Sequence, residues 1–353
     1  MPQHFKIDHI GFLTPGNSTE DRPLAGLEDT LKLFEFGESL GFDSAWIRHR
    51  HLERGVSSAP VFLAAATQRT TDIQLGSAVI QMGYENPFRL AEDLAMVDVL
   101  SGGRLNVGLS AGSPPHAKLL GRLFLDGDPS SVDYSHARAE RLAESLRSDL
   151  LGDDKTVLSS ALGDYRPRVQ PVAVGLTERL WYGGGSLRSA EWAAKNGFNL
   201  LIGNVTTGEK TDDFFEAQLN QLQLYCRNWN IAHRPRIGFG RVIVPFDSAD
   251  RQTRERYRAY AASRHARTLQ PNGERRTLFA RDIIGTSEEI LDQLADDPIL
   301  PLVDEFRMEL PYDFPEGDYR QVMHDFVHAI APVLGWRRTD TALREVTPER
   351  IAG

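Results

Sequence analysis

Eight short apolar runs alternate along this chain with longer amphipathic stretches, and this alternation constrains the fold more than any other feature. The expected strands are Ile7–Leu13, Ser44–Arg48, Ile73–Val79, Leu105–Leu109, Leu180–Tyr182, Asn199–Ile202, Arg236–Val244 and Glu305–Leu310. Short apolar strands that alternate with helices indicate a parallel sheet covered by helices. Eight such units predict an α/β protein of the (β/α)8 TIM-barrel class. A doubly wound open sheet is the alternative, but a chain of 353 residues would normally divide into domains on that plan.

Helix boundary signals support this division of the chain. Asn86 and Pro87 predict the start of a helix that ends at Gly102. Another helix, on which Ala190 lies, is expected to stop at the Asn196-Gly197 pair. We therefore expect a single barrel domain over residues 1–353.

Two long connections interrupt the alternation of strands and helices. They run from Ser110 to Asp133 and from about His265 to Asp282. Loops of this length in a compact domain are usually lids or binding loops. We expect both to be insertions at the carboxyl face of the barrel, where barrel enzymes place their active sites.

Composition excludes several classes of partner and compartment. The net charge of −9 argues against nucleic acid and against an anionic membrane surface as partners. No stretch is long and apolar enough for a membrane span, and the N-terminal residues do not resemble a signal peptide. Cys226 is the single cysteine, and its spacing from Phe215, Leu219 and Leu222 predicts a core position rather than a nucleophile. These features favour a soluble, cytoplasmic protein.

The segment GFDSAWIRHRHL, residues 41–52, contains the densest group of chemically active side chains. His49, Arg50 and His51 follow an apolar strand, at the end where barrel enzymes place catalytic residues. In an unbroken strand, both histidines would point to one face and Arg50 to the other. A histidine can transfer protons near neutral pH, and a guanidinium can stabilise an anion. A basic surface turn is the simpler alternative.

A glycine-rich turn forms the second chemical signal. Leu180-Trp181-Tyr182 is followed by Gly183, Gly184, Gly185 and Ser186, and then by a helix. Glycines let the backbone approach an anion closely, and the free amides at a helix start favour phosphate. Ser186 and Ser189 can add hydroxyl donors, and Arg188 can add charge. Many helices start with such a turn without binding a ligand, so this signal is weak by itself.

Taken together, these segments resemble the bacterial-luciferase-like flavin monooxygenases. The resemblance includes GFDSAWIRHRHL, residues 73–112 with ENPFRLAEDLAMVDVLSGGRL, and WYGGGSLRSAEWAAKNGFNLL at residues 181–201. IIGTSEEILDQL and FRMELP near the end of the chain resemble the last barrel unit of the family. The resemblance covers nearly the whole chain and implies the same (β/α)8 barrel.

The resemblance also implies a cofactor and a reaction. Reduced FMN, supplied by a separate flavin reductase that associates transiently, would react with dioxygen and oxygenate a small organic substrate through a hydroperoxyflavin. The FMN phosphate would lie against Gly184, Gly185, Ser186 and Ser189. The flavin ring would lie over Ser77, Ala78 and Val79, with Ser110 nearby, and a cis peptide bond is expected between Ala78 and Val79. A homodimer is expected because family members are commonly dimers.

This chain departs from the luciferase pattern at its catalytic residues. Luciferases carry Glu-His-His where this chain has His49, Arg50 and His51, and Ser110 and Ala111 replace a reactive cysteine and a phosphate-binding arginine. We predict His51 as the first catalytic candidate, Arg50 as the second and His49 as the third. Arg275 and Arg276 in the second long connection are expected to be solvated surface rather than a substrate clamp.

Three other functions remain open from the sequence. The chain could be a flavin-binding barrel without catalysis, or a deazaflavin-dependent oxidoreductase that transfers hydride. A metal-dependent hydrolase is a remote alternative, because His49 and His51 are spaced like two metal ligands. The remaining ligands are not evident, since His116 and His136 fall in a loop and near a helix start. The sequence therefore predicts no metal site.

Overall fold

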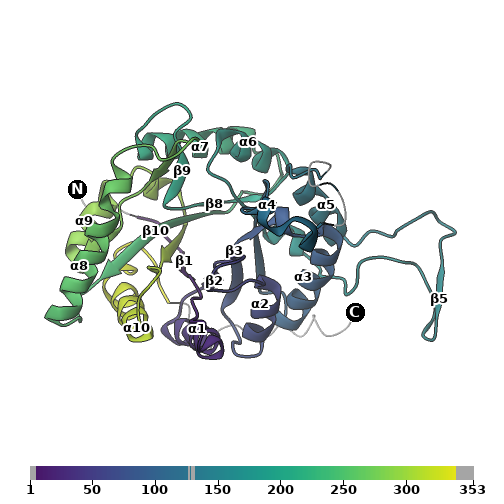
Figure 1. Cartoon of the computed structure of the whole chain (residues 1–353), viewed down its shortest axis with the longest axis horizontal. Coiled ribbons are helices and arrows are strands. Elements are labelled where there is room, and N and C mark those ends of the chain that lie inside the picture. The colour runs from purple at the N-terminus through teal and green to yellow at the C-terminus, as the bar shows by residue number, and fades with distance from the viewer. Residues whose placement is uncertain (1–4, 126–127, 129–131, 339–353) are drawn as a thin grey trace.

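Eight parallel strands close into a barrel surrounded by helices (Figure 1). The computed structural model describes residues 5–125, 128 and 132–338. The barrel strands are β1 (His9–Thr14), β2 (Ser44–Ile47), β3 (Gln74–Gln81), β4 (Leu105–Ser110), β7 (Leu180–Gly183), β8 (Asn199–Ile202), β10 (Ile237–Pro245) and β13 (Glu305–Glu309). Each strand pairs in parallel with its neighbours, and the pairing of β8 with β10 closes the ring. The predicted TIM barrel and its eight strands are confirmed.

Each barrel strand is followed by a helix that covers the outside of the sheet. These helices are α1 (Pro23–Leu40), α2 (Ala59–Thr67), α3 (Pro87–Ser101), α5 (Ala137–Leu146), α6 (Leu187–Lys195), α7 (Phe214–Asn228), α9 (Ser287–Ala295) and α10 (Glu316–Asp325). Asn86 caps α3 by accepting hydrogen bonds from the backbone amides of Phe88 and Arg89, and Gly102 ends the helix in the left-handed conformation. The predicted boundaries of α3 and α6 are therefore correct.

Two hydrophobic layers hold the barrel together. The larger lies between the strands and the surrounding helices. The smaller fills the barrel interior and is formed by Leu13, Trp46, Trp181 and Leu201. The rings of Trp46 and Trp181 meet edge to face with their centroids 5.6 Å apart. Because side chains fill the interior, a ligand can enter only at one end of the barrel.

The two predicted long connections contain short elements. The first contains α4 (Ala117–Leu120), and its residues 126–127 and 129–131 lie outside the described part of the chain. The second follows α8 (Arg251–His265) and includes β11 (Thr277–Phe279), which pairs with β9 (Val205–Thr207). β12 (Ile283–Gly285) then pairs with the carboxyl end of β10. This pairing places the second connection at the carboxyl face, as predicted.

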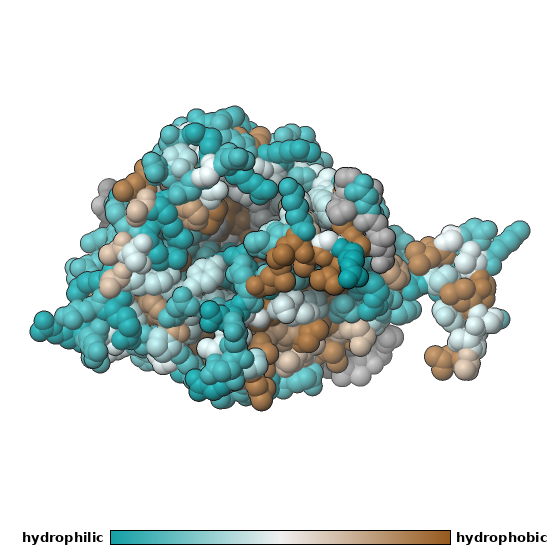
Figure 2. Space-filling view, in the orientation of Figure 1, coloured by the Kyte–Doolittle hydropathy of each residue, from teal (hydrophilic) through white to brown (hydrophobic). Residues whose placement is uncertain are grey.

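The sequence did not predict a third long connection, which lies between α5 and β7. It contains an antiparallel hairpin of β5 (Leu158–Ser160) and β6 (Gly163–Tyr165), which projects away from the barrel in Figure 1. Leu162 at the turn is 99% exposed, and Figure 2 shows hydrophobic side chains on the projecting segment. Its strands are three residues long with no apolar alternation, so no periodic signal marked them.

The predicted core position of Cys226 is wrong. Cys226 is exposed, and Phe215 is also exposed. The buried face of α7 instead carries Ala217, Gln218, Gln221, Leu222 and Tyr225. Gln218 and Gln221 can face inward because each makes a buried hydrogen bond, Gln218 with Arg241 and Gln221 with Thr206. A pattern of apolar residues could not reveal these partners.

In the part of the chain that the structure describes, every helix is too short or too polar to cross a lipid bilayer.

Candidate functional site

The backbone leaves the barrel strand just before the His49–His51 cluster. β2 ends at Ile47, and the amide of Arg50 donates to the carbonyl of Val56 at 2.9 Å. Strict strand alternation therefore does not apply to this cluster. The imidazole rings of His49 and His51 lie together, with centroids 4.4 Å apart, and Arg50 reaches toward Tyr312.

His49 is a buried, neutral imidazole. Its side chain is 2% exposed, and burial above all lowers its pKa to about 4, with the charges of His51 and Arg50 acting in the same direction. Its Nε2 lies 2.8 Å from the carbonyl oxygen of Ser57, so Nε2 carries the hydrogen and donates it. Its Nδ1 has no hydrogen-bond partner among the described residues.

His51 lies next to His49 but is not among the residues that line the adjacent cavity. Its ring stacks on Tyr84 with a centroid distance of 3.9 Å. Burial lowers its pKa, and its buried Nε2 has no partner among the described residues. Arg50 has a different environment: its Nη2 donates to the hydroxyl oxygen of Tyr312 at 3.2 Å, and its buried Nε has no partner in the described chain.

A cavity of about 330 Å³ opens beside this cluster at the carboxyl ends of the strands. It lies among the ends of β2, β3, β4 and β7, and its wall includes residues of both long connections. The lining residues are Arg48, His49, Arg50, Ala78, Val79, Gln81, Ser110, Ala111, Gly112, Ser113, Pro114, Pro115, Gly183 and Arg275. Of the three predicted catalytic residues, His49 and Arg50 line it and His51 does not.

The expected ring-binding residues occupy different positions relative to this cavity. Ala78, Val79 and Ser110 line it, and the peptide bond between Ala78 and Val79 is cis, as expected. Ser77 is buried outside the cavity wall. Its hydroxyl donates to the carbonyl of Gly108 at 3.2 Å and accepts from the amide of Gly108 at 3.1 Å. Ser77 thus joins β3 to β4.

The glycine-rich turn lies next to the cavity at the start of α6. Ser186 caps the helix by accepting from the amide of Ser189 at 3.1 Å, and the two hydroxyl oxygens are 2.8 Å apart. A Cβ atom on Gly184 would lie 2.7 Å from the Cβ of Ser189, so only glycine fits at this point. The turn therefore keeps its backbone open next to two hydroxyl groups.

Neighbouring elements support this turn with polar groups. Gln221 on α7 donates to the carbonyl of Gly184, and the amide of Thr207 donates to the carbonyl of Gly185 at 3.0 Å. The Nε2 of His136 lies 3.5 Å from the hydroxyl oxygen of Ser189. Glu209 accepts from the amide of Leu187 at 3.3 Å, so one amide at the helix start is already occupied.

His136 and Gln221 are functional candidates that the sequence did not identify. His136 stacks on Trp192, and burial followed by the charge of Arg188 lowers its pKa. His136 lies far from the turn in sequence, and Gln221 resembles any polar helix residue. Only the tertiary contacts bring them to Gly184 and Ser189.

Among the residues that the structure describes, one group of side chains could hold a metal ion. His49, His51 and Glu85 each offer one ligand atom, and these atoms lie within 4.8 Å of one another. Burial, followed by repulsion from Asp93, raises the pKa of Glu85. The raised pKa of Glu85 and the positive charge of the nearby Arg50 are both unfavourable for the binding of a cation here.

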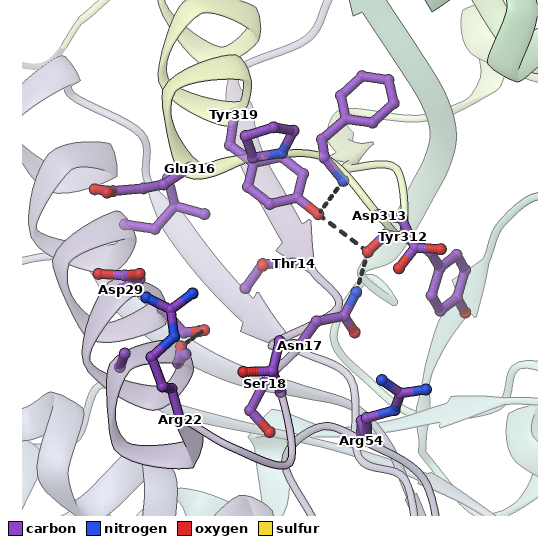
Figure 3. Close-up of a pocket in the computed structure, with 17 residues that line it drawn as sticks. Thr14, Asn17, Ser18, Arg22, Asp29, Arg54, Tyr312, Asp313, Glu316 and Tyr319 are labelled. Carbon is purple, nitrogen blue, oxygen red and sulfur yellow. Dashed lines mark hydrogen bonds between the residues drawn. The ribbon is translucent and has the colours of Figure 1, made fainter.

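A larger cavity of about 690 Å³ lies on the other side of Tyr312, between α1 and α10. Figure 3 shows Asn17 pointing to the backbone carbonyl of Tyr312, while the phenol ring of Tyr312 points away from the rest of this cavity. Asp29, Asp313 and Glu316 are among its lining residues. Size alone would favour this cavity, but the His-Arg cluster and the glycine-rich turn lie at the smaller one.

Comparisons with known proteins fit this geometry. Residues 9–298 match the luciferase-like monooxygenase family, and this chain therefore belongs to that family. The 4-hydroxyprotoasukamycin monooxygenase of Streptomyces nodosus subsp. asukaensis is 32% identical over 143 residues, which are 40% of this chain and 36% of that protein. This chain spans only about a third to just over half of the length of the first curated relatives that it matches.

Solved structures support the fold. The oxygenating constituent of 3,6-diketocamphane monooxygenase from a Pseudomonas putida plasmid, a type II Baeyer–Villiger monooxygenase in complex with FMN, aligns with a TM-score of 0.64 and 14% identity. The alignment covers 94% of this chain and 99% of that one. An F420-dependent secondary alcohol dehydrogenase aligns with a TM-score of 0.55 and 14% identity over 93% of this chain and 99% of that one. The predicted family and fold are confirmed.

Proposed function

We propose that this protein is a flavin-dependent monooxygenase that uses reduced FMN and dioxygen to oxygenate a small organic substrate. The observation that carries the proposal is the cavity at the carboxyl ends of β2, β3, β4 and β7, in a chain of the luciferase-like monooxygenase family. This cavity brings the His-Arg cluster, the Ala78-Val79 peptide and Gly183 of the glycine-rich turn together. The bound flavin would supply the redox chemistry.

The residues present fit an FMN molecule. The wall at Ala78 and Val79 is formed by small side chains that let a flat ring approach the backbone. Four cavity-lining residues have buried polar atoms without partners in the described chain, namely Nε of Arg48, Nδ1 of His49, Nε of Arg50 and Oε1 of Gln81. Buried polar atoms normally have a hydrogen-bond partner, and the polar edge of a flavin ring can supply one.

The phosphate would lie at the start of α6. Gly184 and Gly185 leave the backbone open, and Ser186 and Ser189 provide hydroxyl donors. His136 next to Ser189 can add positive charge when it is protonated. His136 and Arg188 would together supply the positive charge that luciferases obtain from an arginine at the position of Ala111.

Among the three predicted catalytic residues, we expect Arg50 to contact the flavin, because it lines the cavity and its buried Nε has no partner in the described chain. Its guanidinium is charged at any physiological pH and would stabilise an anionic reduced ring. His49 lines the same wall as a neutral imidazole, and His51 would act through His49. The connections that contain Pro114 and Arg275 border the cavity and would limit the access of water.

Rapid mixing tests this proposal. Protein with bound reduced FMN is mixed with oxygenated buffer, and the flavin absorbance is followed over time. We expect flavin reoxidation to be slower than that of free FMN, and the Arg50→Met variant to lose most of this delay. Reoxidation at the rate of free FMN would contradict the proposal and favour a flavin-binding barrel without catalysis.

Two measurements separate the other candidates. The structural similarity to an F420-dependent dehydrogenase favours a deazaflavin enzyme as the second candidate. Tighter binding of F420 than of FMN, with hydride transfer to F420, would support it. Stoichiometric metal in the purified protein, lost in Glu85→Gln, would support the remote metal-dependent alternative.

We also propose a separate flavin reductase as the source of reduced FMN and a homodimer as the assembled form. Sedimentation velocity of the purified chain measures the assembly directly. A monomer over the micromolar range would contradict the dimer.

A further inference from the structure

The cavity wall carries a marked excess of positive charge. Arg48, Arg50 and Arg275 line it, and no aspartate or glutamate is among the described lining residues. Every bound anion lowers the electrostatic free energy of such a wall, whereas a neutral ligand leaves it unchanged. If carboxylates of the protein do not neutralise these arginines, a bound anion is favoured.

The buried carboxylate of Glu309 interacts with two of the surrounding guanidinium groups. Nη2 of Arg48 donates to Oε2 of Glu309 at 2.8 Å. Glu309 also interacts electrostatically with Arg307, whose guanidinium is fully buried and lies over the ring of Trp46. Nε and Nη1 of Arg307 have no partner in the described chain. Glu309 is thus shared by two guanidinium groups, and Glu305, which acts more weakly on Arg307, already forms an ion pair with Arg236.

Arg50 forms no ion pair within 4 Å among the described residues. It donates to the hydroxyl oxygen of Tyr312 at 3.2 Å, and Glu53 acts on it only at longer range. An anionic flavin ring would neutralise one positive charge of this wall. Arg275 would still have no counter-ion.

Arg275 is held at the cavity although no bond to its own side chain fixes it. The neighbouring Arg276 donates through Nε to the carbonyl of Gly208 at 2.9 Å and forms an ion pair with Asp212. The backbone pairing of Asn272 with Thr277 closes the loop around these two arginines. The side chain of Arg275 has no hydrogen bond or ion pair with any described residue, and it lines the cavity.

We propose that Arg275, together with Arg50, binds an anionic group of the substrate, so that the enzyme selects substrates carrying a carboxylate or a sulfonate. This inference rests on the proposed function, because the cavity is taken as the flavin and substrate site. A guanidinium donates two parallel hydrogen bonds to either anion. The larger cavity beyond Tyr312 has three carboxylates and two guanidinium groups in its wall, so it lacks the excess of positive charge found at the smaller one.

The experiment compares ligands that differ in charge but little in shape. Phenylacetate, benzylsulfonate and uncharged phenylacetamide are titrated into the FMN-loaded protein, and binding is read from the visible spectrum of the flavin. We expect both anions to bind more tightly than the amide. In the Arg275→Gln variant, the ratio of the affinity for the anions to the affinity for the amide should fall about tenfold or more, because the hydrogen bonds from the charged guanidinium are lost.

Arg276→Gln is the matched control. It removes a charge from the adjacent residue, which pairs with Asp212 outside the cavity wall, so the preference for anions should persist. Equal binding of phenylacetate and phenylacetamide to the wild-type protein would overturn the inference. The same is true if Arg275→Gln weakens the binding of FMN but not of riboflavin, because Arg275 would then bind the cofactor phosphate.

A calorimetric titration without flavin separates this inference from the proposed function. Failure of FMN to bind contradicts the proposed function, whatever the anions do. If the flavin-free wild-type protein binds phenylacetate and phenylacetamide with equal affinity, the role of Arg275 is contradicted, even if FMN binds normally.

Discussion

At the residue scale, two neighbouring side chains of the cluster differ in charge: His49 is neutral and Arg50 is positive. His49 is enclosed and has a pKa of about 4, so it is a neutral imidazole at pH 7. Arg50 remains charged in a similar environment because the intrinsic pKa of a guanidinium is far above neutrality. The cluster therefore offers one fixed cation and one neutral ring to the cavity, whereas the sequence alone suggests three basic groups.

A pH-dependent prediction concerns His136. Burial and Arg188 lower its pKa, so His136 is mostly neutral near pH 7, and a bound phosphate would favour its protonated form. FMN binding should therefore be coupled to proton uptake by His136. We expect the loss of FMN affinity in His136→Gln to be greater at pH 6 than at pH 8, measured by fluorescence titration.

Two comparisons control this measurement. The ratio of wild-type to variant affinity at each pH removes the contribution of the phosphate's own titration. Riboflavin, which has no phosphate, should bind both proteins equally at either pH. An FMN affinity ratio that does not change with pH would show that His136 is not protonated on binding.

At the element scale, α7 stabilises the glycine-rich turn through a polar contact. Gln221 is buried on the inner face of α7 and donates to the carbonyl of Gly184. Its carbonyl oxygen accepts from the hydroxyl of Thr206 at 3.3 Å. One side chain thus connects α7 to β9 and to the glycine-rich turn before α6, at the predicted phosphate site.

Gln221→Ala should weaken FMN binding by roughly three- to tenfold, because the variant lacks one hydrogen bond that orders the turn. Fluorescence titration measures the affinity, and circular dichroism checks the fold. Gln223→Ala is the matched control, because Gln223 is exposed on the same helix. Equal FMN affinity of the two variants would contradict this role of Gln221.

At the scale of the whole molecule, a buried ion pair connects the barrel wall to its surrounding helices. Nε of Arg241 on β10 lies 2.8 Å from Oδ2 of Asp297, which follows α9, and both side chains are almost fully buried. Nη2 of Arg241 donates to Oε1 of Gln218 on α7 at 2.6 Å. Burial lowers the pKa of Arg241, while the charge of Asp297 favours its protonated form.

Removing one partner leaves the other charge buried without compensation. Asp297→Ala should therefore lower the free energy of unfolding by about 3–5 kcal/mol. Urea unfolding measures this change through the midpoint and slope of the transition. Glu255→Ala, which breaks an exposed pair with Arg251, should have little effect, and equal destabilisation by both variants would contradict the prediction.

The sequence by itself determined the barrel, because short apolar strands and capped helices are encoded in local patterns. All eight barrel strands and the boundaries of α3 and α6 were predicted in this way. The resemblance to the luciferase-like family correctly implied the cis peptide between Ala78 and Val79. Ala78, Val79 and Ser110, which the resemblance placed at the flavin ring, line the cavity, and their contact with a flavin stays a prediction. The hairpin of β5 and β6 was missed because its strands are short and polar.

Tertiary structure alone decided which side chains face the cavity and which face the core. Arg275 and Arg276 are adjacent and chemically identical, but one lines the cavity and the other pairs with Asp212. Cys226 lies on the exposed side of α7, while Gln221 is buried at the glycine-rich turn. These outcomes depend on contacts between residues far apart in the chain. Local patterns of hydrophobicity do not contain that information, because a buried polar group is stabilised only by the partner that the fold brings to it.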